Sequence, residues 1–336
     1  MRRLLSCVLT VLSVFVTSSL LCAQTVSRVF IPGFSTGNIW VYSMAVYGSR
    51  LYIGTANVSS GAEIWLYDGA TWGRVTIPGF SSGNQYVYGM TVYDSRLYVG
   101  TPNVWQYDGK TWSRASPAGF ASGNALSYCM AVYNDRLYIG TANVPSGSQL
   151  WRHDGSAWSR VTIPGFLSGQ NWISSMAVYN NCLFMGTVNL LGAQIWRCDG
   201  ETWGRVTIPG FLSENTWVYS MAVYRNRLYV GTGNVASGAE VWQYDGSDWS
   251  RVPIPGFSSG NEVVYSLAVY NGSLFVGTGN ASGAQLWQYD GTTWSRMAIP
   301  GFSSGNEIVF SMTVCDNRLY LGTLNQSGAQ LWVLSH

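Results

Sequence analysis

The chain has 336 residues, of which only 10% are charged, whereas 15% are aromatic, including 16 Trp. This composition excludes an intrinsically disordered chain, which would be polar and poor in aromatic residues. Lys and Arg number 18 against 16 Asp and Glu, and they form no concentrated run. We therefore expect a globular protein with no nucleic-acid partner, because phosphate backbones are bound by concentrated basic surfaces.

Residues 1–23 differ in composition from the rest of the chain. Arg2 and Arg3 give a positive start, an apolar run fills residues 4–16, and Ala23 supplies a small residue at a cleavage position. This pattern is typical of a secretory signal peptide, so we predict a secreted, periplasmic or cell-surface protein. The alternatives are an uncleaved membrane anchor and a lipid-modified Cys22. Cleavage would remove two of the 18 basic residues, leaving 16 against 16 acidic ones and no transmembrane segment.

From residue 25 onward the chain repeats itself. Each copy passes through a Pro-Gly-Phe corner, which the third copy changes to Pro-Ala-Gly-Phe. The corners end at Phe34, Phe80, Phe120, Phe166, Phe211, Phe257 and Phe302. We divide one predicted domain, residues 24–336, into the units 25–70, 71–110, 111–156, 157–201, 202–247, 248–292 and 293–336. Repeats of 40 to 50 residues are typical of propeller blades.

Each unit holds four short runs that favour β-strands. In the sixth unit they are residues 263–270, 273–278, 284–289 and 294–299, rich in Val, Tyr, Trp and Thr. Asn-Gly and Asp-Gly separate them at 271–272 and 290–291, as in hairpin turns. We predict an all-β, seven-bladed β-propeller of four-stranded blades without helices beyond the leader. A β-sandwich or a β-helix is the alternative.

The two ends of the chain supply a further argument for a propeller. The first strand-like run, residues 26–31, corresponds to an outer strand, and the last unit contains only three runs. One N-terminal strand and three C-terminal strands would together complete the seventh blade and close the ring. Such pairing leaves no exposed sheet edge at the ends.

The repeat resembles the Kelch-like propeller family in its small-residue turn, Tyr and Trp, which are Gly277-Thr278, Tyr289 and Trp294 in the sixth unit. Kelch blades carry a Gly pair where this chain has Gly-Thr. The turn at residues 290–294 is similar to the Asp-box of sialidase-type propellers, but it is one residue shorter between Asp and Gly. The resemblance implies a propeller fold and no particular activity.

Two positions directly before each innermost strand vary between copies and should ring the channel mouth, on the rim with the longer loops. They are Ile39-Trp40, Gln85-Tyr86, Ala125-Leu126, Asn171-Trp172, Thr216-Trp217, Glu262-Val263 and Glu307-Ile308. Aromatic faces bind sugar rings or protein partners. We predict that the ligand is bound by Trp40, Tyr86, Trp172, Trp217, Glu262 and Glu307. The alternative is that these rings only pack between blades.

Four Cys follow the leader, and none forms a Cys-x-x-Cys pair, which argues against a thiolate metal site. Cys182 and Cys198 begin and end two strands that should be antiparallel neighbours, so we predict a disulfide between them. We expect Cys129 and Cys315, which fall in different blades, to be free and buried.

Enzymatic function lacks candidate residues. The two His, His153 and His336, are too few and too far apart for a catalytic triad or a His-rich metal centre. We therefore assign no catalytic residue, metal or cofactor, and predict a monomeric binding protein for a glycan or an extracellular protein. The alternative is a glycoside-acting enzyme that uses Glu262 and Glu307, with Glu214 nearby, because glycosidases need two neighbouring carboxylates.

Overall fold

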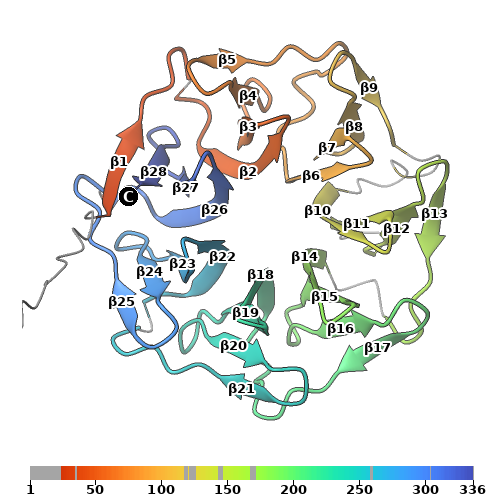
Figure 1. The fold of residues 1–336 in the computed structure, drawn as a ribbon, viewed down its shortest axis with the longest axis vertical. Helices are drawn as coiled ribbons and strands as arrows, with labels where there is room; N and C mark the ends of the chain where they lie inside the picture. The colour runs from red at the N-terminus through yellow and green to blue at the C-terminus, as the bar shows by residue number, and fades with distance from the viewer. Residues whose placement is uncertain are drawn as a thin grey trace, which may run out of the picture.

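The computed structural model describes residues 24–34, 36–116, 120, 126–142, 147–166, 172–257, 260–302 and 304–335. These residues form 28 β-strands in four-stranded antiparallel units that stand around a central axis (Figure 1). The prediction of an all-β, seven-bladed propeller is confirmed. The predicted signal peptide, residues 1–23, lies outside the described residues. No helix in the described part of the chain is long and apolar enough to cross a membrane.

The strands take the same four places in every blade. The inner strands are β2 (Trp40–Tyr47), β6 (Gly89–Tyr93), β10 (Leu126–Tyr133), β14 (Trp172–Tyr179), β18 (Trp217–Tyr224), β22 (Val263–Tyr270) and β26 (Ile308–Cys315). The second strands are β3 (Arg50–Ala56), β7 (Arg96–Gly100), β11 (Arg136–Ala142), β15 (Cys182–Val188), β19 (Arg227–Gly233), β23 (Ser273–Gly279) and β27 (Arg318–Leu324).

The third strands are β4 (Ile64–Tyr67), β8 (Val104–Tyr107), β12 (Leu150–His153), β16 (Ile195–Cys198), β20 (Val241–Tyr244), β24 (Leu286–Tyr289) and β28 (Leu331–Ser335). The outer strands are β5 (Trp72–Arg74), β9 (Trp112–Arg114), β13 (Trp158–Val161), β17 (Trp203–Val206), β21 (Trp249–Arg251), β25 (Trp294–Arg296) and β1 (Thr25–Val29). Blade 1 comprises β2 to β5, the following blades are numbered in chain order, and blade 7 comprises β26 to β28 with β1.

The turn residues in the sequence determine where the strands end. Asn271 and Gly272 both have positive φ, 45° and 72°, which lets the chain reverse in two residues between β22 and β23. The longer loops lie at the opposite end of each blade. They join the outer strand of one blade to the inner strand of the next, and the second strand to the third. We call this loop-bearing edge of the molecule the loop rim.

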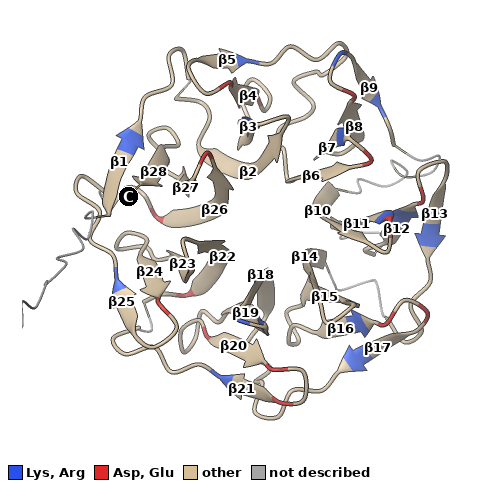
Figure 2. Cartoon of the chain, in the orientation of Figure 1, with Lys and Arg blue, Asp and Glu red and all other residues tan. Residues whose placement is uncertain are grey.

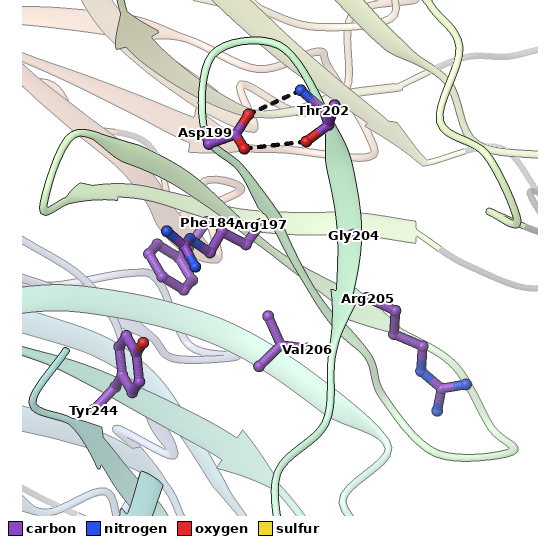
Figure 3. Close-up of a pocket in the computed structure, with 8 residues that line it drawn as sticks. All are labelled: Phe184, Arg197, Asp199, Thr202, Gly204, Arg205, Val206 and Tyr244. Atoms are coloured by element: carbon purple, nitrogen blue, oxygen red, sulfur yellow. Dashed lines mark hydrogen bonds between the residues drawn. The ribbon is translucent and has the colours of Figure 1, made fainter. Parts of the chain in front are cut away.

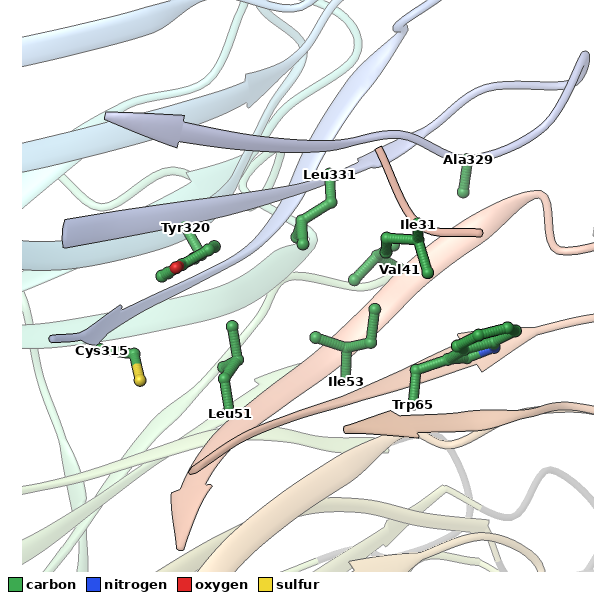
Figure 4. Packing of buried hydrophobic residues seen from close by; sticks show 9 residues of the cluster. All are labelled: Ile31, Val41, Leu51, Ile53, Trp65, Cys315, Tyr320, Ala329 and Leu331. Atoms are coloured by element: carbon green, nitrogen blue, oxygen red, sulfur yellow. The ribbon is translucent and has the colours of Figure 1, made fainter. Parts of the chain in front are cut away.

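The two ends of the chain meet in blade 7. β1 pairs antiparallel with β28, from Thr25 opposite Ser335 to Val29 opposite Leu331. A buried apolar cluster then joins blade 7 to blade 1 (Figure 4). It is made of Ile31, Val41, Leu51, Ile53, Trp65, Cys315, Tyr320, Ala329 and Leu331. Burial of this cluster stabilises the contact between the first and last parts of the chain.

A tyrosine at the end of each inner strand links neighbouring blades on the edge opposite the loop rim. Its hydroxyl donates to a carbonyl in the next blade's hairpin, as Tyr270 does to Asn317 over 2.9 Å and Tyr224 does to Gly272 over 2.7 Å. Blades 1 to 6 all make this bond. In blade 7 the position is Cys315, which packs against blade 1 but has no phenol hydroxyl to make this bond.

Replacing Cys315 with Tyr is expected to raise the free energy of unfolding by about 1 kcal/mol, because one more interblade hydrogen bond forms. The new ring would lie near Tyr67 of blade 1, as Tyr47 lies near Tyr107 of blade 2 with ring centroids 5.9 Å apart. Urea denaturation would measure the change. Tyr270→Phe, which removes the same bond between blades 6 and 7, should lower stability by a similar amount. Unchanged stability of Cys315→Tyr would contradict the expectation.

Candidate functional site

Six of the seven inner strands place one side chain on the channel axis by means of a β-bulge. The bulge leaves one residue of the inner strand outside the ladder with the second strand, as between Val41 and Ser43 in β2. The bulged residues are Tyr42, Tyr128, Ser174, Tyr219, Tyr265 and Phe310, and Tyr88 takes the corresponding place in blade 2. Six of these seven residues are aromatic.

The six aromatic rings form a closed circuit of contacts around the axis, which we call the aromatic plug. Ring-centroid distances around the circuit range from 4.0 Å, between Tyr42 and Phe310, to 6.2 Å, between Tyr128 and Tyr219. The remaining contacts are Tyr42–Tyr88, Tyr88–Tyr128, Tyr219–Tyr265 and Tyr265–Phe310. Tyr128 and Tyr219 meet across blade 4, whose residue on the axis is the small Ser174. The plug therefore lines the channel without a break in its ring contacts at this level.

The phenol groups of the plug stay neutral. The hydroxyls of Tyr42 and Tyr128 lie 2.8 Å apart and form a buried hydrogen bond. Burial raises the pKa of both residues well above the usual value of a phenol, because the charged form would be poorly solvated. The plug is thus aromatic and uncharged.

The predicted mouth aromatics stand at the start of the inner strands, directly beside the plug, and are half-buried. The structure brings Trp40 and Tyr86 together with ring centroids 5.8 Å apart, and Trp40 also stacks on Phe310 at 6.1 Å. Trp172 packs on Tyr128 at 6.2 Å, and Trp217 packs on Tyr219 at 5.9 Å. One face of each ring therefore contacts protein, as the packing alternative anticipated, and part of each ring stays accessible.

The predicted acidic pair lies at the mouth in blades 6 and 7. Glu262 and Glu307 are half-buried, and their backbones hold the rim together. The Glu262 amide donates to Gly279 over 3.0 Å, and the Glu307 carbonyl accepts from Asn280 over 2.9 Å. Burial, with Tyr219 and Glu262 nearby, raises the pKa of Tyr265. The channel mouth therefore has one carboxylate in blade 6 and one in blade 7.

A polar network that sequence reasoning missed supports the loop rim in blades 1, 5, 6 and 7. A fully buried Asn before the inner strand, such as Asn261, donates to the Gln285 side chain over 3.0 Å. Gln285 also accepts from the indole of Trp287 over 3.0 Å, and Thr278 donates to Asn261 over 3.1 Å. Blade 7 repeats these bonds with Asn306, Gln330, Trp332 and Thr323. The sequence feature that could have indicated this network is an Asn, preceded by Gly or Glu, before nearly every inner strand.

The recurring Glu and Gln side chains of the third strand are committed to this network. In blades 1 and 5 the residue is Glu, and it also binds an outer-strand Arg, in the ion pairs Arg74–Glu63 at 3.0 Å and Arg251–Glu240 at 2.9 Å. These are the two ion pairs of the described residues. Arg74 and Arg251 are largely exposed, so each pair contributes little to stability.

Shallow grooves recur beside this network, at the outer edge of the loop rim. The structure has such grooves in blades 1, 5 and 6, with volumes of about 240, 530 and 340 Å³. Each is lined by the loop between the second and third strands, the outer strand and the Pro-Gly-Phe corner. The groove of blade 5 is therefore the largest of the three.

The predicted disulfide between Cys182 and Cys198 is wrong, because both thiols are free. Cys198 lies opposite Leu183 in the β15–β16 ladder, one residue from the expected register. Since side chains alternate across a strand, the shift puts the two Cys on opposite faces of the blade, in different core clusters. Cys129 and Cys315 are also free, Cys315 is buried, and Cys129 is only partly buried.

A lateral pocket at blade 4 contains the Arg197 side chain beside Phe184 (Figure 3). The Arg197 Nε donates to the Cys182 thiol over 3.1 Å, and the Asp199 carboxylate is held by Thr202 in the turn. Arg205, which also lines the pocket, lies opposite Trp196 in the ladder, and its head group points away from Arg197 in Figure 3. The two cations do not converge on a common point, so the pocket forms no anion site.

Charged residues are distributed unevenly over the molecule. Seven Arg lie on the outer strands (Figure 2). The segments that form the loop rim contain no Lys or Arg, and five Glu: Glu63, Glu214, Glu240, Glu262 and Glu307. The loop rim is therefore acidic. Within the described residues, no group of three or more His, Cys, Asp or Glu is placed to hold a metal ion.

Comparison with known proteins supports the fold and leaves the family open. No family model matches the chain, and no curated protein matches it, so the predicted Kelch resemblance is unsupported. A solved structure of YCF48 bound to a D1 peptide is similar over 93% of this chain and 97% of its own, with 11% identity and a TM-score of 0.62. YCF48 from Cyanidioschyzon merolae covers 93% and 99%, with 12% identity and a TM-score of 0.63. At these identities the likeness shows the fold alone.

Proposed function

We propose that this propeller is a non-enzymatic binding protein that holds a polypeptide segment of a partner at the loop rim, over the channel mouth. One observation carries the proposal: Trp40, Tyr86, Trp172 and Trp217 stand at the channel mouth, in contact with one another or with the aromatic plug. Partly exposed aromatic rings are among the side chains that contribute most to protein interfaces. YCF48, which has a similar fold, is known in a structure with a bound peptide.

Carbohydrate binding is the second candidate, because the exposed parts of the Trp172 and Trp217 rings could stack on a sugar. The sequence pattern of residues 1–23 supports the further proposal that the protein is secreted. A glycoside-acting enzyme would need Glu262 and Glu307 as its acid and base. If that were the function, Glu262→Gln and Glu307→Gln would abolish hydrolysis of a glycan that the protein cleaves, and a pure binding protein would cleave none.

The test compares a glycan array with a random peptide display library, using the chain from Gln24 onward. The triple variant Trp40→Ala, Trp172→Ala, Trp217→Ala removes mouth rings. Its matched control, Trp72→Ala, Trp112→Ala, Trp249→Ala, removes the same number of Trp from outer strands. We expect selected peptides whose binding falls at least about tenfold in the mouth variant and not in the control.

Both variants must still unfold cooperatively in urea for the comparison to hold. Selective glycan binding without peptide selection would replace the proposal by the carbohydrate candidate. Selection of neither peptides nor glycans would contradict a binding role for the mouth.

A further inference from the structure

Departures from the repeat gather on the loop rim over blades 4 and 5. In blade 4 the loop after the second strand has Leu190-Leu191, where blade 6 has Ala281-Ser282. The loop into blade 5 contains Leu212 and Glu214. The position of Leu212 is Ser in four other copies, and the position of Glu214 is Gly in all six others. In a chain whose copies differ little, this concentration marks a surface with a property of its own.

The fold brings these departures together. Leu190, Leu191 and Leu212 are 81%, 74% and 50% exposed, although leucine is usually buried. Their two loops are bonded, because the amide of Ala193 donates to the Asn215 carbonyl over 2.8 Å. Gly192 lies directly against Ser213, so the three leucines belong to one continuous surface.

Leu212 also lines the groove of blade 5, which extends the leucine surface toward the outer strand. The groove holds about 530 Å³ and is lined by the apolar side chains of Val252, Ile254 and Phe257. The ion pair between Glu240 and Arg251 forms its polar end. The groove can therefore accept apolar side chains beside one polar contact.

The loop beside this groove lacks a bond that holds the corresponding loops elsewhere. In blades 6 and 7 the second Asn of the polar network donates to the first, as Asn280 does to Asn261 over 3.1 Å. In blade 5 the Asn215 Oδ1 and the Asn234 Nδ2 are buried and have no partner. Since a missing bond lowers the cost of moving a loop, residues 234–239 should adjust to a ligand more easily than the corresponding loops of blades 6 and 7.

Charge decides what kind of ligand fits. The loop rim has no cation, and its Glu63 and Glu240 are neutralised by outer-strand Arg. Glu214, Glu262 and Glu307 have no ion pair among the described residues, and Glu214 shares a loop with Leu212. An acidic ligand would meet these three unpaired carboxylates and, in the groove, an Arg251 already paired with Glu240, whereas Lys or Arg would find complementary charge.

We propose that Leu190, Leu191, Leu212 and the blade 5 groove form the docking site for a partner's polypeptide segment in which apolar side chains are flanked by Lys or Arg. The inference rests on the proposed function and names its partner class. Three leucines and one groove offer contact area for a few peptide side chains. A stable dimer of this chain would need about 20–30 contacting residues from each copy, so a short segment fits the surface better than a second copy does.

The test uses the same random peptide display library on the chain from Gln24 onward. The expected result is selection of peptides rich in Leu, Phe or Trp together with Lys or Arg. The variant Leu190→Ala, Leu191→Ser, Leu212→Ser restores residues found in other copies, so it should fold, and binding of the selected peptides should fall at least about tenfold. Glu214→Gly should weaken binding and reduce its loss between about 0.05 and 0.5 M NaCl.

Ala281→Gln is the matched control, because it exchanges residues between copies elsewhere on the rim and should leave binding unchanged. Peptides lost in the Trp40, Trp172, Trp217 variant but kept in the leucine variant would overturn this inference and retain the proposed function. Selection of acidic peptides would also overturn it. A library that yields no binder would overturn both.

Discussion

Tyr42→Ala is expected to lower the free energy of unfolding by about 3–5 kcal/mol, as removal of a buried aromatic ring does in other cores. Tyr42 is 6% exposed and contacts five aromatic rings, among them Phe310 at 4.0 Å and Tyr88 at 5.1 Å. The substitution removes these contacts from the centre of the molecule and leaves the Tyr128 hydroxyl without its partner at 2.8 Å. The midpoint and slope of urea denaturation would measure the loss.

Two companion variants separate packing from hydrogen bonding in the plug. Tyr42→Phe keeps the ring and removes only the bond to Tyr128, so its cost should be about 1 kcal/mol. Ser174→Tyr would add a seventh ring where Tyr128 and Tyr219 already meet, and overpacking should cost about 1–3 kcal/mol. A stabilising effect of Ser174→Tyr would show that the plug has an unfilled gap at blade 4.

Gly231→Ala is expected to lower the free energy of unfolding by about 2–3 kcal/mol, although it adds only one methyl group. Gly231 lies in β19, where blade 6 packs directly against the backbone of blade 5. A Cβ atom there would lie 2.7 Å from Ser220 Oγ and 2.7 Å from the Val264 Cβ, closer than side chains can approach. Blade 6 would have to shift, and the Ser220 hydrogen bond to the Val264 carbonyl, 3.2 Å, would be strained.

Gly204→Ala is the matched control for this prediction. Gly204 is also a strand residue, in β17, and no heavy atom lies within 4 Å of an added Cβ. Its substitution should change stability by no more than about 0.5 kcal/mol. Equal effects of the two alanine substitutions in thermal or urea unfolding would mean that close approach of the blades is not what requires Gly231.

Much of the fold was predictable from the sequence because strand and turn signals are local. Residues 263–270 were predicted as a strand and form β22 with the same bounds. Positive φ at Asn271 and Gly272 confirms the turn that follows. The outer strands are shorter than predicted: residues 294–299 were expected, and β25 ends at Arg296, because the chain turns away toward the Pro-Gly-Phe corner.

The site was less predictable because it depends on contacts between blades. The mouth positions of Trp40 and Tyr86 followed from counting strands, whereas the plug did not, because a one-residue bulge decides that Tyr42 points to the axis. The register between β15 and β16 was likewise not predictable to within one residue. A shift of one residue places Cys182 and Cys198 on opposite faces of the blade.

The sequence by itself determined the number of blades, the four strands of each and the edge that bears the long loops, because each of these depends on a pattern within one repeat. Only the tertiary structure decided which residues meet around the axis and which leucines share one surface on the rim. Tyr42 and Phe310 are far apart in the chain, as are Leu191 and Leu212 to a lesser degree. Their contact is set by how neighbouring blades pack and by bulges and registers that no single repeat encodes.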